Sequence, residues 1–214
     1  MGNTISLYTF AGTEADASRI QRRFIKHFVS APGPIADLGC GRGGFLAQLM
    51  AAGIPAVGVD ASSESIEFCR KRGFNIVQDE VLHFLTSNEQ VLGGIFFSHV
   101  VEHLNPNQAA EFFSLAHRAL KTGGRMVVAT PNALDLWTMT EVFWLDTTHV
   151  RPYPLPLLCQ YSSQAGFRVA QTGTHGLGYR PMGRRHLPRY LWRRLIWGKE
   201  YGRSDAWILV ERTQ

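Results

Sequence analysis

The sequence predicts an α/β protein in which helices cover both faces of a mostly parallel sheet, giving a three-layer sandwich. Two observations predict this class. Short apolar segments alternate with longer helical patterns, and glycines follow the ends of several of these segments and helical patterns. The 214 residues suffice for one domain with its own core, and 45% apolar with 18% charged residues is ordinary for a globular protein. This composition excludes a disordered chain.

The elements follow one another in a regular order. Seven strands are expected, at residues 34–38, 56–60, 75–78, 94–98, 124–130, 168–172 and 206–211. Helices are expected near residues 14–29, 43–52, 62–72, 106–120 and 155–165. Ser62 is a suitable cap for the third helix, and Gly73 and Gly166 end helices. We expect a single domain made of an N-terminal helical cap (1–30), a ligand-binding core (31–172), a basic insertion (173–204) and the last strand (205–214).

The most informative segment runs from residue 35 to 45, where an apolar strand reaches Asp37 and then breaks into a glycine turn that opens a helix. Gly39, Gly41 and Gly43 allow the backbone to approach a ligand closely, and the helix start presents unpaired N–H groups. The segment therefore predicts a nucleotide site rather than a purely structural turn.

Two nucleotide classes fit the glycines. The pattern G-x-G-x-x-G is satisfied by Gly39, Gly41 and Gly44, with Asp60, 16 residues further on, as a ribose ligand of a dinucleotide. However, a carboxylate at Asp37 would repel a pyrophosphate and would suit a ligand that carries an amino group. The order Asp-x-Gly-x-Gly-x-Gly resembles motif I of the class I S-adenosylmethionine-dependent methyltransferases. This resemblance implies S-adenosyl-L-methionine as cofactor and a Rossmann-like, seven-stranded sheet with an antiparallel last strand.

Further acids end the second and third strands. Asp60, followed by Ala61, can accept hydrogen bonds from a ribose diol, or it can simply cap the next helix. The resemblance implies an acid near the adenine amino group and an apolar residue against its ring, although Asp79 can equally cap a helix running through Leu85. The candidate cofactor-binding residues are Asp37, Gly39, Cys40, Gly41, Gly43, Phe45, Asp60, Ala61, Asp79, Glu80, Val81, Ser98 and His99.

Two later segments extend the resemblance, the first to the same superfamily and the second to a narrower family. The fourth strand is followed by Glu-His-Leu at 102–104, an ending common in this superfamily, which implies that His99 or His103 faces the transferred methyl group. The segment 143–153 resembles the W-x-D-x-T-H-x-R-P segment of bacterial methyltransferases associated with cell-surface polysaccharide and lipopolysaccharide assembly, with Thr147 in place of an expected Pro. This resemblance implies a saccharide acceptor and an oxygen nucleophile.

The candidate catalytic residues follow from the acceptor chemistry. A sugar hydroxyl needs a base, and a histidine with a pKa near neutral is a natural one, so His103 and His149 are candidates. Asp146 can orient His149 or pair with Arg151, and for an anionic acceptor Arg151 or Tyr8 can suffice by positioning it. Alternatively, His103 caps a loop or contacts the cofactor, and His149 belongs to a structural hydrogen-bonded loop. We expect no metal.

The positive charge is concentrated in one segment. The chain has a net charge of +5, and residues 179–203 alone carry +7, which leaves −2 for the rest. Binding of nucleic acid by the whole domain is therefore not expected. Within residues 186–203, Leu187, Leu191 and Leu195 form a helical stripe flanked by arginines, which suits peripheral contact with an anionic inner membrane. Alternatively, the leucines pack on their own domain, or the segment serves as a dimer contact or a lid.

Cysteine usage and the N-terminus indicate the compartment. Cys40, Cys69 and Cys159 are too few and too scattered for a disulfide framework or a C-x-x-C metal site. The sequence shows no secretory signal and no apolar run near the ~18 residues of a membrane span, so we expect a cytoplasmic protein with a peripheral contact at the membrane. Two other functions stay open, namely a methyltransferase for a quinone-type or natural-product metabolite and a catalytically silent cofactor-binding partner protein.

Overall fold

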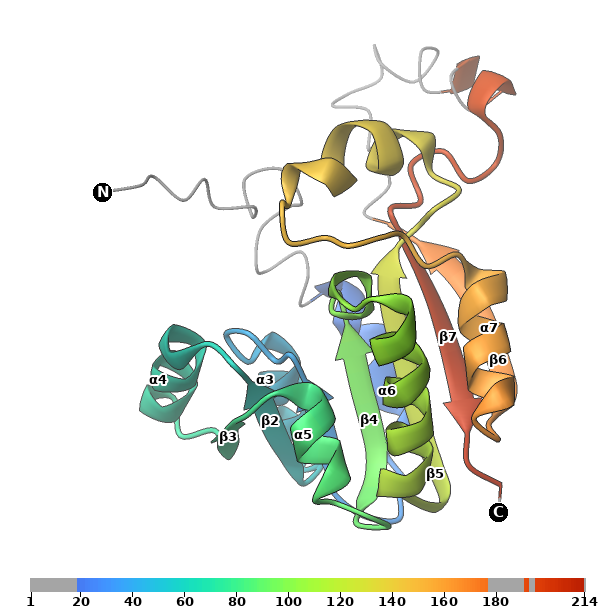
Figure 1. Cartoon of the computed structure of the whole chain (residues 1–214). Helices are drawn as coiled ribbons and strands as arrows, with labels where there is room; N and C mark the ends of the chain where they lie inside the picture. Colours follow the sequence, from blue (N-terminus) through green and yellow to red (C-terminus); the bar gives the residue numbers. More distant parts are fainter. Residues whose placement is uncertain (1–18, 177–190, 193–194, 214) are drawn as a thin grey trace.

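The computed structural model describes residues 19–176, 191–192 and 195–213. Its centre is a seven-stranded sheet with helices on both faces (Figure 1). The strands are β1 (Ile35–Leu38), β2 (Ala56–Asp60), β3 (Ile76–Gln78), β4 (Leu92–Ser98), β5 (Leu120–Pro131), β6 (Arg168–His175) and β7 (Asp205–Glu211). Their order is β3-β2-β1-β4-β5-β7-β6, and only the pairings of β7 with β5 and β6 are antiparallel. The predicted fold class, including the antiparallel last strand, is confirmed.

The helices are α3 (Gly44–Ala51), α4 (Ser63–Lys71), α5 (Val81–Thr86), α6 (Pro106–Ala119) and α7 (Leu155–Gln164). Of these, α4 and α6 begin where a polar side chain binds the first free N–H groups. Ser62 accepts the Ser65 N–H to cap α4, and Asn105 forms a capping box with Gln108 at the start of α6. Shorter turns are the 3₁₀ helices η1 (Arg22–His27), η2 (Val101–His103) and η4 (Phe143–Leu145), and the π-helix η3 (Thr138–Val142).

Both faces of the central strand β4 are buried, which explains its continuous apolar sequence. Because successive side chains in a strand point to opposite faces, Phe96 and Phe97 pack in different layers. The Phe97 ring stacks on Phe112 of α6 at 3.9 Å between centroids, and the Phe96 ring stacks on Phe45 of α3 at 3.8 Å. The two aromatic layers hold the sheet between α6 on one side and α3 with η1 on the other.

Three expectations differ from the structure. The helix expected over 14–29 is, in its described part, a short helical turn at 19–21 that tightens into η1 and ends at His27; residues 14–18 lie outside the described part. Strand β5 begins at Leu120 rather than 124, because the buried Leu120 pairs with Leu92 before a register shift. The segment between β5 and α7, expected as a loop, contains η3 and η4. Buried Asp135 accepts the Thr138 hydroxyl at 2.7 Å and so supports the start of η3.

Candidate functional site

A pocket of about 280 Å³ opens at the carboxyl ends of β1, β2, β3 and β4. This is where the strand order reverses between β1 and β4, the position at which open α/β sheets bind ligands. The pocket is lined by Gly39, Asp60, Ala61, Asp79, Glu80, Val81, His99, Val100 and His103. Seven of the candidate cofactor residues therefore meet in one place, together with one of the two candidate catalytic histidines.

The glycines after β1 are required for two different reasons. Gly39, Gly41 and Gly43 all have positive φ angles, of 71°, 51° and 73°. A Cβ on Gly39 would lie 2.4 Å from Val100 Cγ2, and one on Gly43 would lie 2.7 Å from the Phe74 ring, so packing excludes side chains there. A Cβ on Gly41 would meet no atom within 4 Å. Gly41 therefore needs its conformation, and the space beside it is open to a ligand.

Asp60 fixes the glycine loop with both of its carboxylate oxygens. Oδ2 accepts the Gly41 N–H at 2.8 Å, and Oδ1 accepts the Ser62 N–H at 2.9 Å. Each oxygen keeps a further lone pair on the pocket side, as binding of a diol requires. The cap of α4 is Ser62, so the alternative that Asp60 is merely the helix cap is wrong.

Asp37 is a buried carboxylate with an unsatisfied atom. The residue is 4% exposed, and its Oδ2 has no hydrogen-bond partner. Burial, together with the nearby charge of Asp60, raises the pKa of Asp37 to about 8. A cationic amino group would satisfy this oxygen and favour its ionised form. With the open space at Gly41, the orphaned oxygen fits a nucleoside ligand that carries an ammonium group.

Two candidate cofactor residues have side chains that face the core. The Phe45 ring is 1% exposed and stacked on Phe96, and Cys40 is 8% exposed with its sulfur next to Gly58. Neither residue lines the pocket, and side chains this buried do not reach it, so cofactor binding by Cys40 and Phe45 stays a prediction. Phe45 lies on the face of α3 that covers the sheet, which a glycine-loop pattern alone does not reveal.

Asp79 is held in place at the adenine end of the predicted site. Its two oxygens lie 2.8 and 2.9 Å from His83 Nδ1, and Oδ1 also accepts the Glu80 N–H. The cap position of α5 is Glu80, one residue later, so the alternative that Asp79 itself caps this helix is wrong. Ser98, at the end of β4, is half-buried and does not line the pocket.

His99 lines the pocket in a left-handed conformation with a φ of 57°. Its ring lies between two carboxylates: Nε2 is 3.0 Å from Asp205 Oδ1, and Nδ1 is 3.5 Å from Glu102 Oε1. Burial opposes the charged ring, but Asp205 and Glu102 outweigh it and raise the pKa of His99 well above its ordinary value. The sequence did not reveal Asp205 as a partner, because it comes from β7, over 100 residues away.

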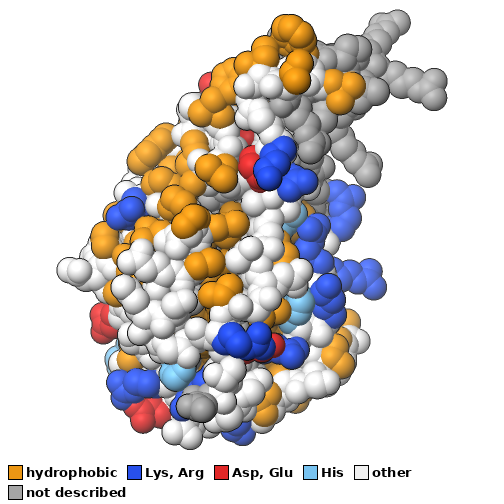
Figure 2. Space-filling model, turned by 90° about the vertical axis from the view of Figure 1, so that its right-hand side faces the viewer, with side chains coloured by type: hydrophobic (Ala, Val, Ile, Leu, Met, Phe, Trp, Pro, Cys, Tyr) orange, Lys and Arg blue, Asp and Glu red, His pale blue; other side chains and the backbone are white. Residues whose placement is uncertain are grey.

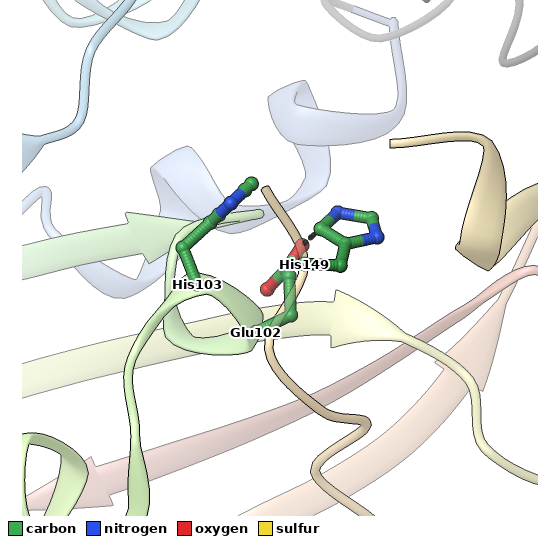
Figure 3. A group of neighbouring side chains, drawn as sticks. All are labelled: Glu102, His103 and His149. Atoms are coloured by element: carbon green, nitrogen blue, oxygen red, sulfur yellow. Dashed lines mark ion pairs between the residues drawn. The ribbon is translucent and has the colours of Figure 1, made fainter. Parts of the chain in front are cut away.

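Glu102 joins the pocket to the segment 143–153. Its backbone oxygen accepts the N–H groups of Val150 at 2.9 Å and Arg151 at 3.3 Å. Its side chain is completely buried; Oε2 accepts the Thr130 hydroxyl at 3.0 Å, and Oε1 has no hydrogen-bond partner. These bonds bring His149 beside His103, as Figure 3 shows, with ring centroids 4.7 Å apart. The structure thus brings the two candidate histidines together.

Hydrogen bonds define which nitrogen of each histidine is free. His149 Nδ1 lies 2.6 Å from the Phe143 carbonyl, which can only accept, so Nδ1 donates, and in the neutral ring Nε2 carries the lone pair. Thr148 donates its hydroxyl to Asp146 at 2.6 Å, and its oxygen lies 2.9 Å from His103 Nδ1. His103 Nδ1 must therefore donate to Thr148, which leaves Nε2 of His103 free as well.

The remaining candidates are arranged differently from expectation. Asp146 holds Thr148 through its N–H and hydroxyl, with Oδ2 3.8 Å from His149 Nε2, so its closest contacts orient His103 through Thr148. The Arg151 guanidinium lies 5.3 Å from the centroid of the Tyr153 ring rather than against Asp146. Tyr8 lies outside the described residues.

The described part of the segment 186–203 exposes its apolar side chains at residues 191–192 and 195–197, whereas Tyr201 is buried. Leu191 and Leu195 are 56% and 76% exposed, so the alternative that these leucines pack on their own domain is wrong. Exposed apolar side chains also occur at Trp144 and Leu145, and Figure 2 shows hydrophobic side chains gathered at the upper end of the molecule. Leu187 lies outside the described residues. Among the residues that the structure describes, no helix is both long enough and apolar enough to cross a bilayer.

Comparisons with known proteins agree with this geometry. A family model described as "Methyltransferase domain" matches residues 14–172. A SAM-dependent methyltransferase from Archaeoglobus fulgidus superposes with a TM-score of 0.82 at 26% identity, covering 95% of this chain and 96% of that one. A 1,6-didemethyltoxoflavin-N1-methyltransferase from Burkholderia thailandensis, solved with 1,6-didemethyltoxoflavin and S-adenosylhomocysteine, shares the fold at 16% identity, with a TM-score of 0.66 over 98% of this chain and 82% of that chain.

One curated relative matches in sequence. It is an uncharacterized 37.1 kDa protein in transposon TN4556 of Streptomyces fradiae, 31% identical over 148 residues. The match spans 64% of this chain and 41% of that protein.

Proposed function

Since the chain belongs to the methyltransferase domain family, we propose that it transfers a methyl group to an oxygen of a saccharide or saccharide-phosphate in envelope polysaccharide synthesis. The enzyme class and the cofactor, S-adenosyl-L-methionine, follow from the family and its structural relatives. The observation that supports the acceptor is the position of Glu102, which joins the segment 143–153 to the rim of the cofactor pocket.

In this proposal, different residues at the pocket bind different parts of the cofactor. Asp60 would hold the ribose diol, Asp79 and Val81 would contact the adenine, and Asp37 would face the amino group of the methionine moiety. The open space beside Gly41 leaves room for the methionine moiety itself. S-adenosyl-L-methionine supplies a methyl group on an already electrophilic sulfonium, so the protein mainly has to align an acceptor and exclude water.

The acceptor would lie on the His103 side of the pocket. His103 and His149 present free Nε2 lone pairs there, and a neutral imidazole nitrogen can act on the proton of a hydroxyl group. Asp146 and Thr148 hold His103 in this tautomer. For an acceptor that also carries a phosphate, Arg151 supplies a nearby positive charge.

A lipid-linked acceptor explains the segment 186–203. This segment combines a strong positive charge with Leu191, Trp192, Leu195, Ile196 and Trp197, all of which are exposed. Apolar side chains beside arginines suit an anionic membrane surface, where basic residues bind lipid headgroups. We propose that this segment holds the cytoplasmic enzyme at the inner membrane, next to its acceptor.

A second candidate function is methylation of a small aromatic metabolite. The exposed Trp137 and Trp144 between β5 and α7 could stack on such an acceptor. The Burkholderia protein, which shares the fold, was solved with a small heterocyclic ligand.

Transfer of labelled methyl groups separates these functions. The purified protein would be incubated with methyl-labelled S-adenosyl-L-methionine and, in parallel, with a lipid-linked saccharide fraction and a pool of aromatic metabolites. We expect label in the saccharide fraction as an O-methyl group. Label in the metabolites alone would replace the proposal by the second candidate. Absence of transfer to either, with retained binding of S-adenosylhomocysteine, would indicate a catalytically silent partner protein.

A further inference from the structure

We infer that Glu102, His103 and His149 form a binding site for one divalent transition-metal ion. Each residue offers one ligand atom, and the three atoms lie within 4.8 Å of one another (Figure 3). Glu102 Oε1 and His149 Nε2 are 4.0 Å apart, whereas two metal bonds of about 2.0–2.2 Å at a tetrahedral angle join atoms about 3.4 Å apart, so small side-chain rotations would bring the ligands to binding distance. The metal's role in methyl transfer rests on the proposed function, whereas its binding does not.

In their neutral forms His103 and His149 each offer an acceptor nitrogen to this cluster, and Glu102 offers a carboxylate oxygen. His149 Nε2 and His103 Nε2 carry lone pairs, because both Nδ1 atoms donate hydrogen bonds elsewhere. Glu102 Oε1 is buried and has no hydrogen-bond partner. A buried carboxylate oxygen that faces imidazole lone pairs is destabilised unless a cation lies between them. His99 also contacts Oε1, with its Nδ1 at 3.5 Å, while its Nε2 lies 3.0 Å from Asp205 Oδ1.

The outer atoms of the three side chains are bound as in established metal sites. Metal-binding histidines usually donate their second N–H to a carbonyl, carboxylate or other fixed acceptor, which sets the tautomer. His149 donates to the Phe143 carbonyl, and His103 donates to Thr148, which in turn donates to Asp146. Glu102 Oε2 accepts the hydroxyl of Thr130. Each candidate ligand is thus oriented from outside while its inner atom stays free.

The ligand set indicates the kind of ion. Two imidazoles and one carboxylate suit Zn²⁺ and similar first-row divalent ions rather than Ca²⁺ or Mg²⁺, which prefer oxygen ligands. Three protein ligands also leave a coordination position open, as in catalytic rather than structural zinc sites. His103 belongs to the wall of the cofactor pocket, so the open position can face the acceptor.

A metal there would replace a protein base in activating the acceptor. The bound hydroxyl becomes more acidic, as water does on Zn²⁺. Its O–H bond breaks and the proton passes to water, while an oxygen lone pair forms the new C–O bond. The electron pair of the C–S bond stays on the sulfur of S-adenosylhomocysteine. His103 and His149 then remain neutral ligands throughout.

Direct titration of the full chain with metal tests this inference. Protein stripped with a chelator would be titrated with Zn²⁺ by calorimetry, and with Co²⁺ by visible absorption, which reports the coordination geometry. We expect one equivalent of Zn²⁺ in the wild-type protein. Glu102→Gln and His149→Gln should each weaken binding more than about 100-fold, and Thr148→Val, which removes only the partner of His103, about 10–100-fold.

His117→Gln is the matched control, because His117 lies at the end of α6 near Gly166. It should keep the wild-type affinity for Zn²⁺, and circular dichroism would verify folding of every variant. If the Glu102→Gln variant does not fold, the Zn²⁺ affinity of the His149→Gln variant alone tests the metal site. Absence of stoichiometric Zn²⁺ binding, or equal binding by the wild type and His149→Gln, would overturn the metal site. The metal-free protein would also be titrated with S-adenosylhomocysteine, because the proposed cofactor contacts involve no metal. Retained cofactor binding without Zn²⁺ binding would overturn the metal site alone, whereas loss of cofactor binding would count against the proposed function.

Discussion

The carboxylate of Asp60, at the end of β2, accepts the N–H of Gly41 in the loop after β1 at 2.8 Å. This bond joins two of the residues that the sequence marks as cofactor ligands and gives the loop its shape before any ligand arrives. Because Oδ1 is fixed in turn by the Ser62 N–H, the carboxylate cannot rotate freely. The ribose site is therefore preorganised by backbone groups, which lowers the entropic cost of binding.

Replacement of Asp60 should weaken cofactor binding. Asp60→Ala removes the charge-assisted acceptor of the ribose diol and loosens the Gly41 loop, so we expect S-adenosylhomocysteine to bind about 1–3 kcal/mol more weakly. Calorimetric titration measures this difference. Glu64→Ala, an exposed acid in the first turn of α4, serves as the control and should bind normally. An unchanged affinity in Asp60→Ala would remove this residue from the site.

Gly41 and Gly53 form a matched pair for testing the open space in the glycine loop. Both have positive φ, 51° and 69°, and an added Cβ meets no atom within 4 Å at either position. Alanine should therefore cost each protein a similar strain of about 1–2 kcal/mol in the free energy of unfolding. Only Gly41→Ala should also weaken S-adenosylhomocysteine, because its methyl group enters the ligand's space. Equal affinities for the two variants would show that Gly41 does not contact the ligand.

Asp37 should make stability depend on pH. Its pKa is about 8 in the folded protein, against 3.8 for an ordinary aspartate. Between these values the unfolded chain is ionised at this residue and the folded one is protonated, so stability falls as pH rises from about 4 to about 8, by up to about 1.4 kcal/mol per pH unit. Below this window the residue contributes no pH dependence.

Denaturant unfolding of the wild type and Asp37→Asn at several pH values measures this effect. The difference in unfolding free energy between them should grow in favour of the asparagine variant as pH rises. Parallel pH profiles would contradict the raised pKa. Binding of S-adenosylhomocysteine should release a proton in the wild type only, because its ammonium group favours ionised Asp37; titration in buffers of different ionisation enthalpy detects this release.

Phe45 should affect stability rather than cofactor binding. Its ring stacks on Phe96 of β4, meets Phe28 edge-on and is 1% exposed, so Phe45→Ala should destabilise the protein by about 3–5 kcal/mol. Phe45→Leu, which keeps most of the apolar volume, should lose less stability. At a temperature where Phe45→Leu is folded, its affinity for S-adenosylhomocysteine should equal that of the wild type. A large loss of affinity there would restore Phe45 to the binding site.

The sequence predicted the cofactor side of the site because its signals are local. The acid, the glycines and the next strand's acid lie within one β-α-β segment, and the fold brings their ends to a common edge. The direction of Phe45 could not be predicted, because it depends on which face of α3 meets the sheet. The partners of His99 and Glu102 were also missed. Asp205 and Thr130 come from β7 and β5, and only the assembled sheet brings them together.

The candidate residues of the proposed acceptor side lie close together in the structure, but their bonding differs from expectation. The segment 143–153 suggested Asp146 as a partner of His149 or Arg151, whereas in the structure its shortest bonds are to Thr148. Thr148 then determines the tautomer of His103, 45 residues earlier in the chain. Such a relay depends on the bonds from Val150 and Arg151 to the Glu102 carbonyl, which no sequence pattern specifies.

Calorimetric titration of the protein with S-adenosylhomocysteine tests the central claim most directly, because it requires no knowledge of the acceptor. The pocket at the ends of β1, β2, β3 and β4 predicts one site with micromolar affinity in the wild type and a clearly weakened one in Gly41→Ala. Absence of binding in the folded wild-type protein would contradict the assignment of this pocket to the cofactor.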